Sequence, residues 1–230
     1  MQSVQEKTNP SLDDIKQKEE KFYKEPAPKP VYAFFKRFFD LLLATFALIL
    51  LSPVFLVVAI AIKAEDGGPV FFVQTRLTKN GKPFKMFKFR SMCIDAEAKL
   101  ESLMSQNEMK GPAFKIADDP RITKVGKFVR RTSIDELPQL LNIIKGDMAI
   151  IGPRPPLPRE VEQYTPYQLH RLDVKTGLAC YHECQGRSDS PDFDEWVESD
   201  LKYIRERSLL TDMKVIWWTI RIVLTGKGAV

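Results

Sequence analysis

An uncharged, strongly apolar segment at residues 41–62 constrains the fold of this chain more than any other feature of its sequence. An α-helix rises about 1.5 Å per residue, so a helix over this segment would extend roughly 33 Å, enough to cross the apolar part of a bilayer. Most buried helices of water-soluble domains are shorter than this. We therefore expect the segment to enter a membrane.

Ser52 and Pro53 interrupt the segment near its middle. Proline has no backbone N–H and disfavours helical geometry at the preceding residue, so each half would form a helix only about 15–18 Å long. Basic residues flank the two ends in equal number: Lys24, Lys29, Lys36 and Arg37 before it, and Lys63, Arg76, Lys79 and Lys82 after it. A spanning helix, which tolerates a proline, would export one group, whereas a re-entrant hairpin keeps both in the cytoplasm. Both topologies remain open, and the charge balance favours the hairpin.

The apolar segment divides the chain into three predicted regions. Residues 1–31 are charged and proline-containing, and we expect them to form a mobile tail. Residues 32–63 form the membrane hairpin, and residues 64–230 form the remaining domain. The first apolar run begins roughly forty residues into the chain behind charged residues, so we expect no cleavable signal peptide.

The pattern of apolar and polar residues predicts a predominantly helical α+β domain. Strand-like runs at 70–76 and 84–90 flank Asn80-Gly81, a pair that favours a tight turn, so we expect a small β-hairpin. Helices are expected over residues 95–106, 133–144, 159–164, 193–207 and 211–224, and loops over 152–158 and 175–192.

The last expected helix has two possible environments. Trp217 and Trp218 lie among basic residues, Lys214 and Arg221, which suits a helix lying in the plane of a membrane surface. Packing of this helix against the domain core is equally consistent with the sequence.

The most informative polar stretch contains the adjacent carboxylates Asp135 and Glu136. Ser133 and Glu136 have the spacing of a capping box. Alternatively, Asp135 is the N-cap and Pro138 occupies the third helical position, where a missing N–H costs nothing. Adjacent positions point about 100° apart on a helix, so one carboxylate can face a ligand while the other orients or caps. Acidic residues at helix N-termini are also favoured by the helix dipole alone, which permits a purely structural role.

Basic residues on constrained segments accompany the acidic pair. Prolines on both sides of Arg154 fix its backbone, and Arg187 follows a glycine. Lys88 and Arg90 end the expected hairpin, and Arg130 precedes the acidic pair. Guanidinium groups on rigid segments suit bidentate binding of phosphate. Each of these residues alone is typical of a solvated surface, but together, beside two carboxylates and a membrane segment, they indicate a phosphate site.

Cysteine content and net charge exclude two other kinds of protein. The three cysteines are too few for a disulfide framework, and Cys180, His182 and Cys184 lack a fourth zinc ligand other than His170, so we expect no zinc site. The formal charge of +5 is the only argument for nucleic-acid binding. Because the basic residues are scattered and the apolar segment would have no role, we expect no nucleic-acid partner.

Several short motifs occur in a fixed order within residues 32–230. They are Lys36-Arg-Phe-Phe-Asp40, Ser52-Pro53, Phe87-Lys-Phe-Arg-Ser-Met92, Ser133-Ile-Asp-Glu-Leu-Pro-Gln-Leu140, Lys145-Gly-Asp-Met148, Ile151-Gly-Pro-Arg-Pro155 and Gly186-Arg187. Together they resemble the bacterial sugar transferases, monotopic phosphoglycosyl transferases that start exopolysaccharide, capsule or glycan assembly. The chain resembles the small catalytic form of this family, without the multi-span N-terminal extension of larger relatives.

The resemblance implies a two-step reaction. A sugar phosphate moves from a UDP-sugar to polyprenyl (undecaprenyl) phosphate, and UMP is released. Asp135 matches the carboxylate nucleophile that forms a phosphosugar-aspartyl intermediate, and Glu136 matches its acidic partner. Magnesium is the family's cofactor; Asp135 would lie beside Mg²⁺, and Asp200 is a weaker candidate for the same site.

The resemblance also implies which cations bind the substrate phosphates and where the protein works. Arg154 and Arg187 match phosphate-site arginines, Lys88 and Arg90 match the basic end of the hairpin, and we add Arg130 to this group. The expected fold is a monotopic membrane protein with a proline-broken re-entrant helix, a small β-hairpin and a cytosolic catalytic domain. We expect it on the cytoplasmic face of the bacterial inner membrane, with polysaccharide assembly proteins as further partners.

The chain departs from the family's pattern between residues 175 and 187. Where relatives carry proline, threonine, glycine and glutamine, this sequence has Thr176, Ala179, Cys180 and Glu183. The glutamate adds a negative charge near the expected phosphate site, so donor-sugar preference and the level of activity are open. A second hypothesis follows, in which the chain is a catalytically silent, membrane-anchored partner in a polysaccharide assembly complex.

Overall fold

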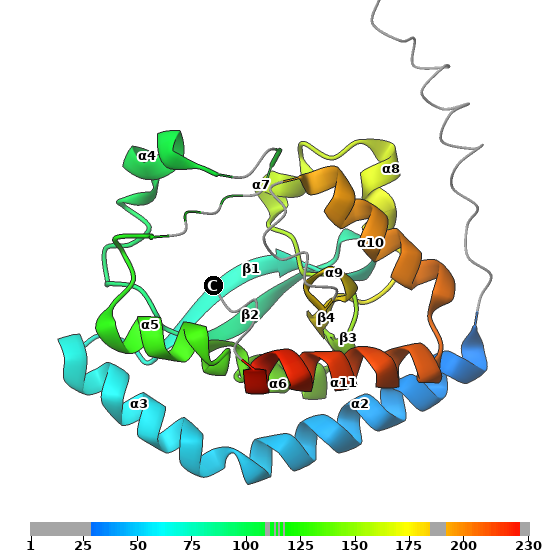
Figure 1. Cartoon of the computed structure of the whole chain (residues 1–230), viewed down its shortest axis with the longest axis horizontal. Helices are drawn as coiled ribbons and strands as arrows, with labels where there is room; N and C mark the ends of the chain where they lie inside the picture. The colour runs from blue at the N-terminus through cyan, green and yellow to red at the C-terminus, as the bar shows by residue number, and fades with distance from the viewer. Residues whose placement is uncertain are drawn as a thin grey trace, which may run out of the picture.

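Two long helices that meet at an angle, α2 (Pro30–Leu50) and α3 (Ser52–Asp66), run along one side of the molecule, and the other elements pack above them (Figure 1). The structure is a computed structural model, and it describes residues 29–108, 111, 112, 114, 116, 118–184 and 192–225. Nearly all of the expected mobile tail lies outside these residues. The described part is predominantly helical, as the sequence predicts, and it contains two small sheets.

The bend between α2 and α3 falls at the predicted break. The two helix axes differ by 59°. The Ser52 hydroxyl donates to the Ile49 carbonyl oxygen at 2.8 Å, and Pro53 lies in the first turn of α3, where its missing N–H is tolerated. Within the described ranges, no single helix has the length and apolar composition of a membrane span, whereas α2 and α3 together do. The re-entrant topology stays a prediction.

Most of the apolar side chains of α2 and α3 point away from the rest of the protein. Only a narrow stripe that includes Ala44, Val58 and Ile62 is buried against the domain. The exposed large apolar residues of the pair are Val31, Phe34, Phe35, Phe38, Phe39, Leu42, Leu43, Phe46, Ile49, Leu50, Leu56, Val57 and Ile60. A contiguous apolar face of this extent marks a surface that contacts a membrane or another protein.

The predicted hairpin is confirmed. Strands β1 (Phe71–Leu77) and β2 (Pro83–Phe89) pair antiparallel. Their connection, η1 (Lys79–Gly81), places Asn80 and Gly81 at φ of 59° and 70°, a region that asparagine and glycine enter readily. The turn pair therefore gives the chain its sharp reversal.

A second, parallel sheet was not predicted. Strand β3 (Ala149–Ile151) pairs with β4 (Gly177–Ala179), so the expected loop over 175–192 is wrong where β4 and α9 (Tyr181–Cys184) occur. Each strand has three residues, too few to show an alternating pattern. The pairing depends on a close backbone approach, because a Cβ on Gly177 would lie 2.1 Å from the Gly152 nitrogen.

The helices after β2 differ in part from those expected. Residues 95–106 form turns followed only by α4 (Leu100–Leu103) and η2 (Met104–Gln106), and α5 (Lys124–Arg131) was not predicted. The Thr123 side chain accepts a hydrogen bond from the Gly126 N–H at 2.9 Å and caps α5. This cap, and contacts with α3, stabilise a helix too short for a clear apolar repeat.

The C-terminal half follows the prediction more closely. Residues 152–157 lack regular structure, as expected, and α7 (Pro158–Val161) covers only the first part of the helix expected over 159–164. Two short elements, α8 (Pro166–Leu169) and η4 (His170–Leu172), follow. The two last helices are confirmed as α10 (Phe193–Glu206) and α11 (Leu209–Thr225).

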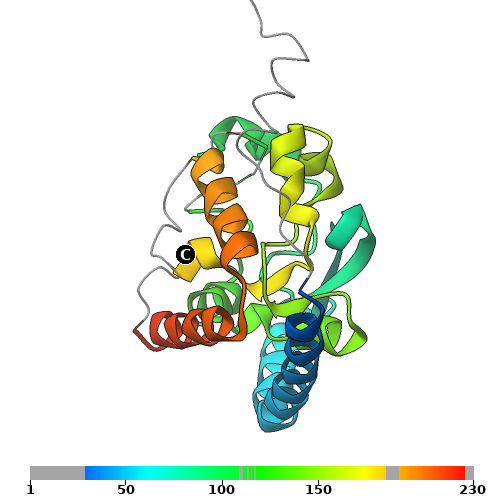
Figure 2. The ribbon, with the colours of Figure 1, turned by 90° about the vertical axis from the view of Figure 1, so that its right-hand side faces the viewer.

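Helix α11 packs against the core on one side, one of the two environments that the sequence left open, and its contact with a membrane surface stays a prediction. Val215 is fully buried in the core formed with α10 and β3, whereas Leu210, Met213, Trp217 and Ile220 are exposed. Figure 2 shows α2 and α3 projecting from the base of the molecule with α11 beside them. Helix α11 therefore lies on the same side of the protein as the bent helix pair.

Candidate active site

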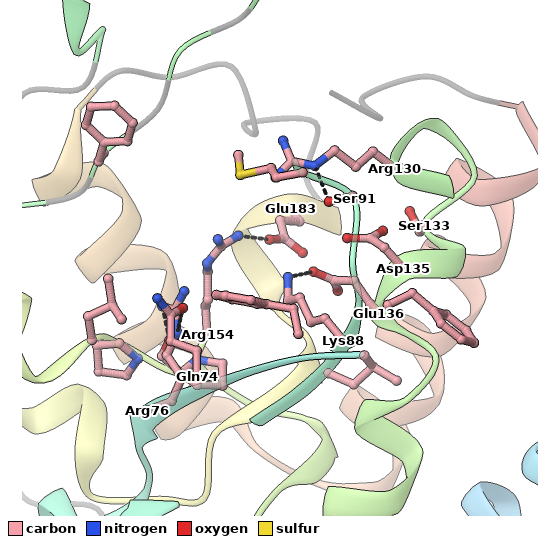
Figure 3. Close-up of a pocket in the computed structure, with 18 of the residues that line it drawn as sticks. Gln74, Arg76, Lys88, Ser91, Arg130, Ser133, Asp135, Glu136, Arg154 and Glu183 are labelled. Atoms are coloured by element: carbon pink, nitrogen blue, oxygen red, sulfur yellow. Dashed lines mark hydrogen bonds and ion pairs between the residues drawn. The ribbon is translucent and has the colours of Figure 1, made fainter. Parts of the chain in front are cut away.

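A cleft with a volume of about 830 Å³ contains most of the charged residues that the sequence singled out (Figure 3). Its walls come from the hairpin, from η3 (Ile134–Glu136), from the segment 152–157 and from α9 and α10. These elements are far apart in the sequence. Asp135, Glu136, Lys88, Arg130 and Arg154 all line this cleft.

The acidic pair lies on a tight turn rather than at the start of a long helix. Ser133 adopts φ of 55°, η3 follows, and α6 (Gln139–Lys145) begins only after Pro138. Both expected caps are wrong, because neither Ser133 nor Asp135 caps α6 with its side chain. Pro138 has no N–H to donate, so the hydrogen-bond ladder is interrupted and the predicted helix over 133–144 divides into two pieces.

The side chain of Asp135 is held in a poorly solvated position. The residue is 8% exposed. Burial raises the pKa of Asp135 to about 6, and the neighbouring Glu136 charge adds to this, while Lys88 and Arg130 oppose it. Among the residues that the structure describes, Asp135 has no ion-pair partner within 4.0 Å, so its partly desolvated carboxylate is available to a ligand in the cleft.

Glu136 is instead committed to a neighbour. Its Oε1 accepts a hydrogen bond from Lys88 Nζ at 2.6 Å. Burial acts to raise the pKa of Glu136, but the positive charges of Lys88, Arg154 and Arg76 outweigh it, and the pKa is lowered from its ordinary value. The two carboxylates therefore have different surroundings. Asp135 is available to a ligand in the cleft, whereas Glu136 holds the Lys88 ammonium group in place.

Arg154 extends into the cleft from a rigid segment. Pro153 and Pro155 are buried, whereas the Arg154 side chain is 43% exposed. Its Nη1 lies 3.5 Å from Glu183 Oε1, and its guanidinium lies 5.6 Å from the centre of the Trp196 ring. In Figure 3 this guanidinium extends toward the middle of the cleft. The glutamate that departs from the family's pattern is therefore the resident partner of Arg154.

Arg130 and Ser91 occupy the opposite part of the cleft. Arg130 Nε donates to the Ser91 hydroxyl at 3.0 Å. Burial lowers the pKa of Arg130 from its ordinary value, although the charge of Asp135 partly offsets this. Arg130 lies close enough to Asp135 for their charges to interact.

Two further predicted site residues form ion pairs with neighbours, and of these Arg90 lines the cleft whereas Asp200 does not. Arg90 is buried and binds both carboxylate oxygens of Asp66, while its Nε donates to the Pro69 carbonyl oxygen at 2.6 Å. Asp200 is 1% exposed and its Oδ2 lies 2.7 Å from Arg171 Nη2. Each of these two side chains therefore has an ion-pair partner in the structure, and the phosphate role of Arg90 and the metal role of Asp200 stay predictions. Arg187 lies outside the described residues.

The sequence reasoning underused one residue of the cleft, Arg76, and missed Asn142, which supports the hairpin that forms one of its walls. Arg76 lies on β1 and was counted only as a flanking charge; its Nη1 donates to the Pro155 carbonyl oxygen at 2.9 Å. Asn142 of α6 is fully buried and holds the edge of β2, donating to the Lys85 carbonyl at 2.6 Å and accepting from the Phe87 N–H at 3.0 Å. Neither side chain stands out in the sequence, because each acts across a long sequence separation.

The carboxylates of the cleft suit magnesium better than a preformed metal cage. Among the described residues, no group of three or more His, Cys, Asp or Glu side chains is arranged to hold a metal ion. Mg²⁺, however, usually takes one or two protein carboxylates together with substrate phosphate oxygens. The carboxylates of Asp135 and Glu183 both line the cleft, so the oxygen donors present fit such a site.

Comparison with known proteins agrees with the motif resemblance. The sequence model of the family "Bacterial sugar transferase" matches residues 31–226. "Galactosyl transferase CpsE" of Streptococcus agalactiae is 46% identical over 194 residues, which are 84% of this chain and 43% of that protein. "Exopolysaccharide production protein ExoY" of Sinorhizobium fredii is 39% identical over 207 residues, which are 88% of this chain and 91% of that protein.

A further relative is named by its reaction. The "UDP-N-acetylgalactosamine-undecaprenyl-phosphate N-acetylgalactosaminephosphotransferase" of Aeromonas hydrophila is 40% identical over 207 residues, 88% of this chain and 46% of that protein. The chain thus spans less than half the length of this relative and of CpsE, and nine-tenths of ExoY. The chain belongs to the bacterial sugar transferase family, as its motifs indicated.

Proposed function

We propose that this protein transfers a sugar phosphate from a UDP-sugar to undecaprenyl phosphate and releases UMP. The observation that carries the proposal is one cleft that contains an uncommitted carboxylate, Asp135, beside Lys88, Arg130 and Arg154, in a molecule with a large exposed apolar face. Relatives whose names state this type of reaction match more than four-fifths of the chain. The step would be the first membrane step in exopolysaccharide, capsule or glycan synthesis.

The proposed reaction proceeds by two displacements at one phosphorus atom. An Asp135 oxygen attacks the sugar-bearing phosphorus of the donor, the bond to the UMP oxygen breaks, and UMP leaves. An oxygen of undecaprenyl phosphate then attacks the same phosphorus, the bond to Asp135 breaks, and the diphosphate-linked sugar forms. Covalent catalysis suits this transfer because the soluble donor and the membrane-bound acceptor need not be bound at the same time.

The cations of the cleft address the main electrostatic obstacle. A diphosphate repels an approaching carboxylate, so the attack needs positive charge that is already in place. Lys88 is fixed by its 2.6 Å hydrogen bond to Glu136, and Arg154 is carried by a segment between two prolines. When Mg²⁺ is bound, beside Asp135, it would supply further neutralisation of phosphate charge. We also place Arg187 among the phosphate-binding residues, by its motif alone.

We further propose that the bent helix pair enters the cytoplasmic leaflet of the bacterial inner membrane as a re-entrant hairpin. The exposed apolar residues of α2 and α3 support this placement, as does the position of α11, a helix with exposed apolar residues of its own, beside the pair. Membrane insertion at this side would hold the cleft near the headgroup layer, where the acceptor phosphate lies. Labelling of single cysteines placed before α2 and after α3 tests it, because accessibility from opposite sides would exclude the hairpin.

The reaction is tested by the nucleotide that is released. The protein, in detergent or vesicles, is incubated with Mg²⁺, undecaprenyl phosphate and a panel of UDP-sugars, including UDP-galactose, UDP-glucose and N-acetylated sugars. We expect UMP with one preferred donor, and a mass increase of one sugar phosphate on the protein when the acceptor is omitted. Release of UDP would instead show direct glycosyl transfer and exclude the aspartyl intermediate.

One observation favours a second candidate, a catalytically silent partner in a polysaccharide assembly complex. Glu183, which replaces the family's glutamine, occupies Arg154 with its own carboxylate. If that pair prevents donor binding, the protein inserts into membranes correctly but releases no UMP with any donor of the panel. Turnover with any one of these donors excludes the silent role.

A further inference from the structure

The cleft face of the hairpin carries a second cation besides Lys88. Residue pairs directly opposite one another in an antiparallel sheet share a face, and alternate residues of one strand share that face too. Lys88 pairs with Phe72, so the alternation along β1 places Gln74 and Arg76 on the side of Lys88. Arg76 and Lys88 accordingly both line the cleft, together with Arg154.

Arg76 is held in place by the segment that carries Arg154. Its Nη1 donates to the Pro155 carbonyl oxygen at 2.9 Å, and its Nε donates to Gln74 Oε1 at 3.2 Å. The neighbouring Leu77 N–H donates to the Pro156 carbonyl oxygen at 3.0 Å. Strand β1 therefore fixes the backbone on both sides of the Pro155–Pro156 peptide, and Arg76 is oriented before any substrate arrives.

These contacts use only part of the guanidinium group, which has five N–H donors. The Nη2 group takes part in no hydrogen bond among the described residues, and the side chain is only partly covered. Figure 3 shows the guanidinium groups of Arg76 and Arg154 on the same side of the cleft. An edge of Arg76 thus remains available to an anion that Arg154 also contacts.

An anion bound between the guanidinium groups of Arg76 and Arg154 would offset the repulsion between their like charges. Burial and the charge of Arg154 lower the pKa of Arg76 to about 10, although the charges of Glu160 and Glu136 act in the opposite direction. Two guanidinium groups that repel one another in a partly buried cleft are stabilised when a doubly charged anion bridges them. Phosphate oxygens match this arrangement in charge and in geometry.

Building on the proposed function, we propose that Arg76 is a further phosphate-binding residue, and that Arg76 and Arg154 together bind the diphosphate of the donor. The remaining edge of Arg76 contacts a phosphate oxygen, while its other donors keep Arg154 in position. Contact and positioning are thus combined in one residue. Lysine at this position keeps the charge but cannot brace Pro155 and contact phosphate at the same time.

The test measures binding of inorganic pyrophosphate to the full chain by isothermal titration calorimetry at low and moderate salt. Pyrophosphate carries the diphosphate without sugar, nucleoside or reaction. We expect Arg76→Gln to weaken binding about tenfold, as Arg154→Gln does, and to reduce its salt dependence; Arg76→Lys should weaken it about threefold. The matched control is Arg205→Gln, which removes one positive charge from α10 outside the cleft and should change binding less than twofold.

Binding within twofold of wild type for Arg76→Gln, with Arg154→Gln impaired, would overturn the proposal. Because Arg76→Gln also removes a brace, a second measurement uses the unaltered chain: phenylglyoxal modification of arginines, located by mass spectrometry. Saturating pyrophosphate should protect Arg76 and Arg154 but not Arg205, and an unprotected Arg76 contradicts the assignment. Pyrophosphate binding that follows this pattern without UMP release from any donor would disprove the proposed function and leave the phosphate role of Arg76 standing.

Discussion

The charged cleft and the bent helix pair are built from opposite kinds of contact. In the cleft, carboxylates and cations lie close together, as in the 2.6 Å pair of Lys88 and Glu136. The helix pair exposes apolar side chains along most of its length, and its firm polar contacts lie toward its two ends: Lys36 of α2 bonds to Asp212 at 3.1 Å, and Asp66 of α3 binds Arg90. One region is organised by charge and the other by the removal of apolar surface from water.

We infer from this difference that the reaction and the membrane attachment depend on separate parts of the chain. Removing a charge from the cleft leaves the apolar face intact, and adding a charge to the apolar face leaves the cleft intact. The comparison therefore predicts two sets of variants with opposite phenotypes. A variant that changed both properties together would show that the two regions act as one unit.

The largest effect is expected from Asp135→Asn. The amide has nearly the same shape but is a far poorer nucleophile, so UMP release should fall by at least about 10³-fold. Association with lipid vesicles, measured by flotation, should not change, because Asp135 lies in the cleft and not on the apolar face. Activity within tenfold of wild type would place the nucleophile on another residue.

The next largest effect is expected from the double variant Phe38→Glu with Leu42→Glu. Both side chains are exposed on α2. Burying each of them in a membrane would contribute roughly 1.5–3 kcal/mol to binding, and a carboxylate in its place would lose this contribution. The fraction of protein that floats with vesicles should fall by at least about tenfold, while pyrophosphate binding is retained. Retained flotation would show that another surface holds the protein to the membrane.

The control for this variant lies on the opposite side of the molecule. Leu169 is also an exposed leucine, but it ends α8, which is far from the bent pair in Figure 1. Leu169→Glu should float as the wild type does. A loss equal to that of the α2 variant would mean that any added negative charge weakens binding, and that the apolar face of α2 has no special role.

The two regions also differ in how far the sequence predicts them. The break at Ser52-Pro53 and the hairpin around Asn80-Gly81 could be predicted because backbone chemistry fixes both locally. The acidic pair and Arg154 line one cleft, as expected of residues predicted to share a site, although the predicted helix over 133–144 was wrong at Pro138. The effect of a residue on its local backbone conformation can thus be predicted from the sequence.

Contacts between distant residues account for most of what was missed. The pairing of β3 with β4 joins segments almost thirty residues apart and depends on Gly152 and Gly177 rather than on a strand pattern. The ion pair of Arg90 with Asp66, 24 positions earlier, was not predicted either. Arg76 resembles a flanking charge until Pro155 is placed beside it.

A third prediction tests whether burial of the charged Asp135 carboxylate destabilises the folded protein. Because the pKa of Asp135 is raised to about 6 in the folded protein, the unfolded chain loses this proton at lower pH than the folded chain does. The stability that the bound proton contributes is therefore complete below pH 4 and is lost as the pH rises through 6. Asp135→Asn should unfold at a higher temperature than wild type at pH 8 and at the same temperature at pH 4.

This comparison is made by thermal unfolding in EDTA, so that no divalent cation neutralises the carboxylate. The matched change on the exposed surface is Asp173→Asn, which removes a carboxylate that is about one-third exposed and lies outside the cleft. The difference in unfolding temperature between Asp173→Asn and wild type should not increase in favour of the variant from pH 4 to pH 8. Equal unfolding temperatures of Asp135→Asn and wild type at pH 8 would show that Asp135 is well solvated.

The smallest expected effect concerns Glu183, where the cleft departs from its relatives. Its pair with Arg154 is 3.5 Å long, and both side chains are about two-fifths exposed, so the pair contributes at most about 1 kcal/mol. Glu183→Gln removes a negative charge that competes with the donor diphosphate for Arg154. We expect pyrophosphate to bind up to about fivefold more tightly to this variant, with unchanged flotation.

Glu162→Gln is the matched control, since Glu162 is exposed and does not line the cleft. A stronger response, in which Glu183→Gln converts a protein without turnover into one that releases UMP, would support the silent role for the natural chain. If Glu183→Gln instead weakens pyrophosphate binding, and does so only when Mg²⁺ is present, Glu183 holds the cation with Asp135. Each outcome identifies which charge of the cleft Glu183 balances, because Arg154 and a divalent cation respond to its loss with opposite signs.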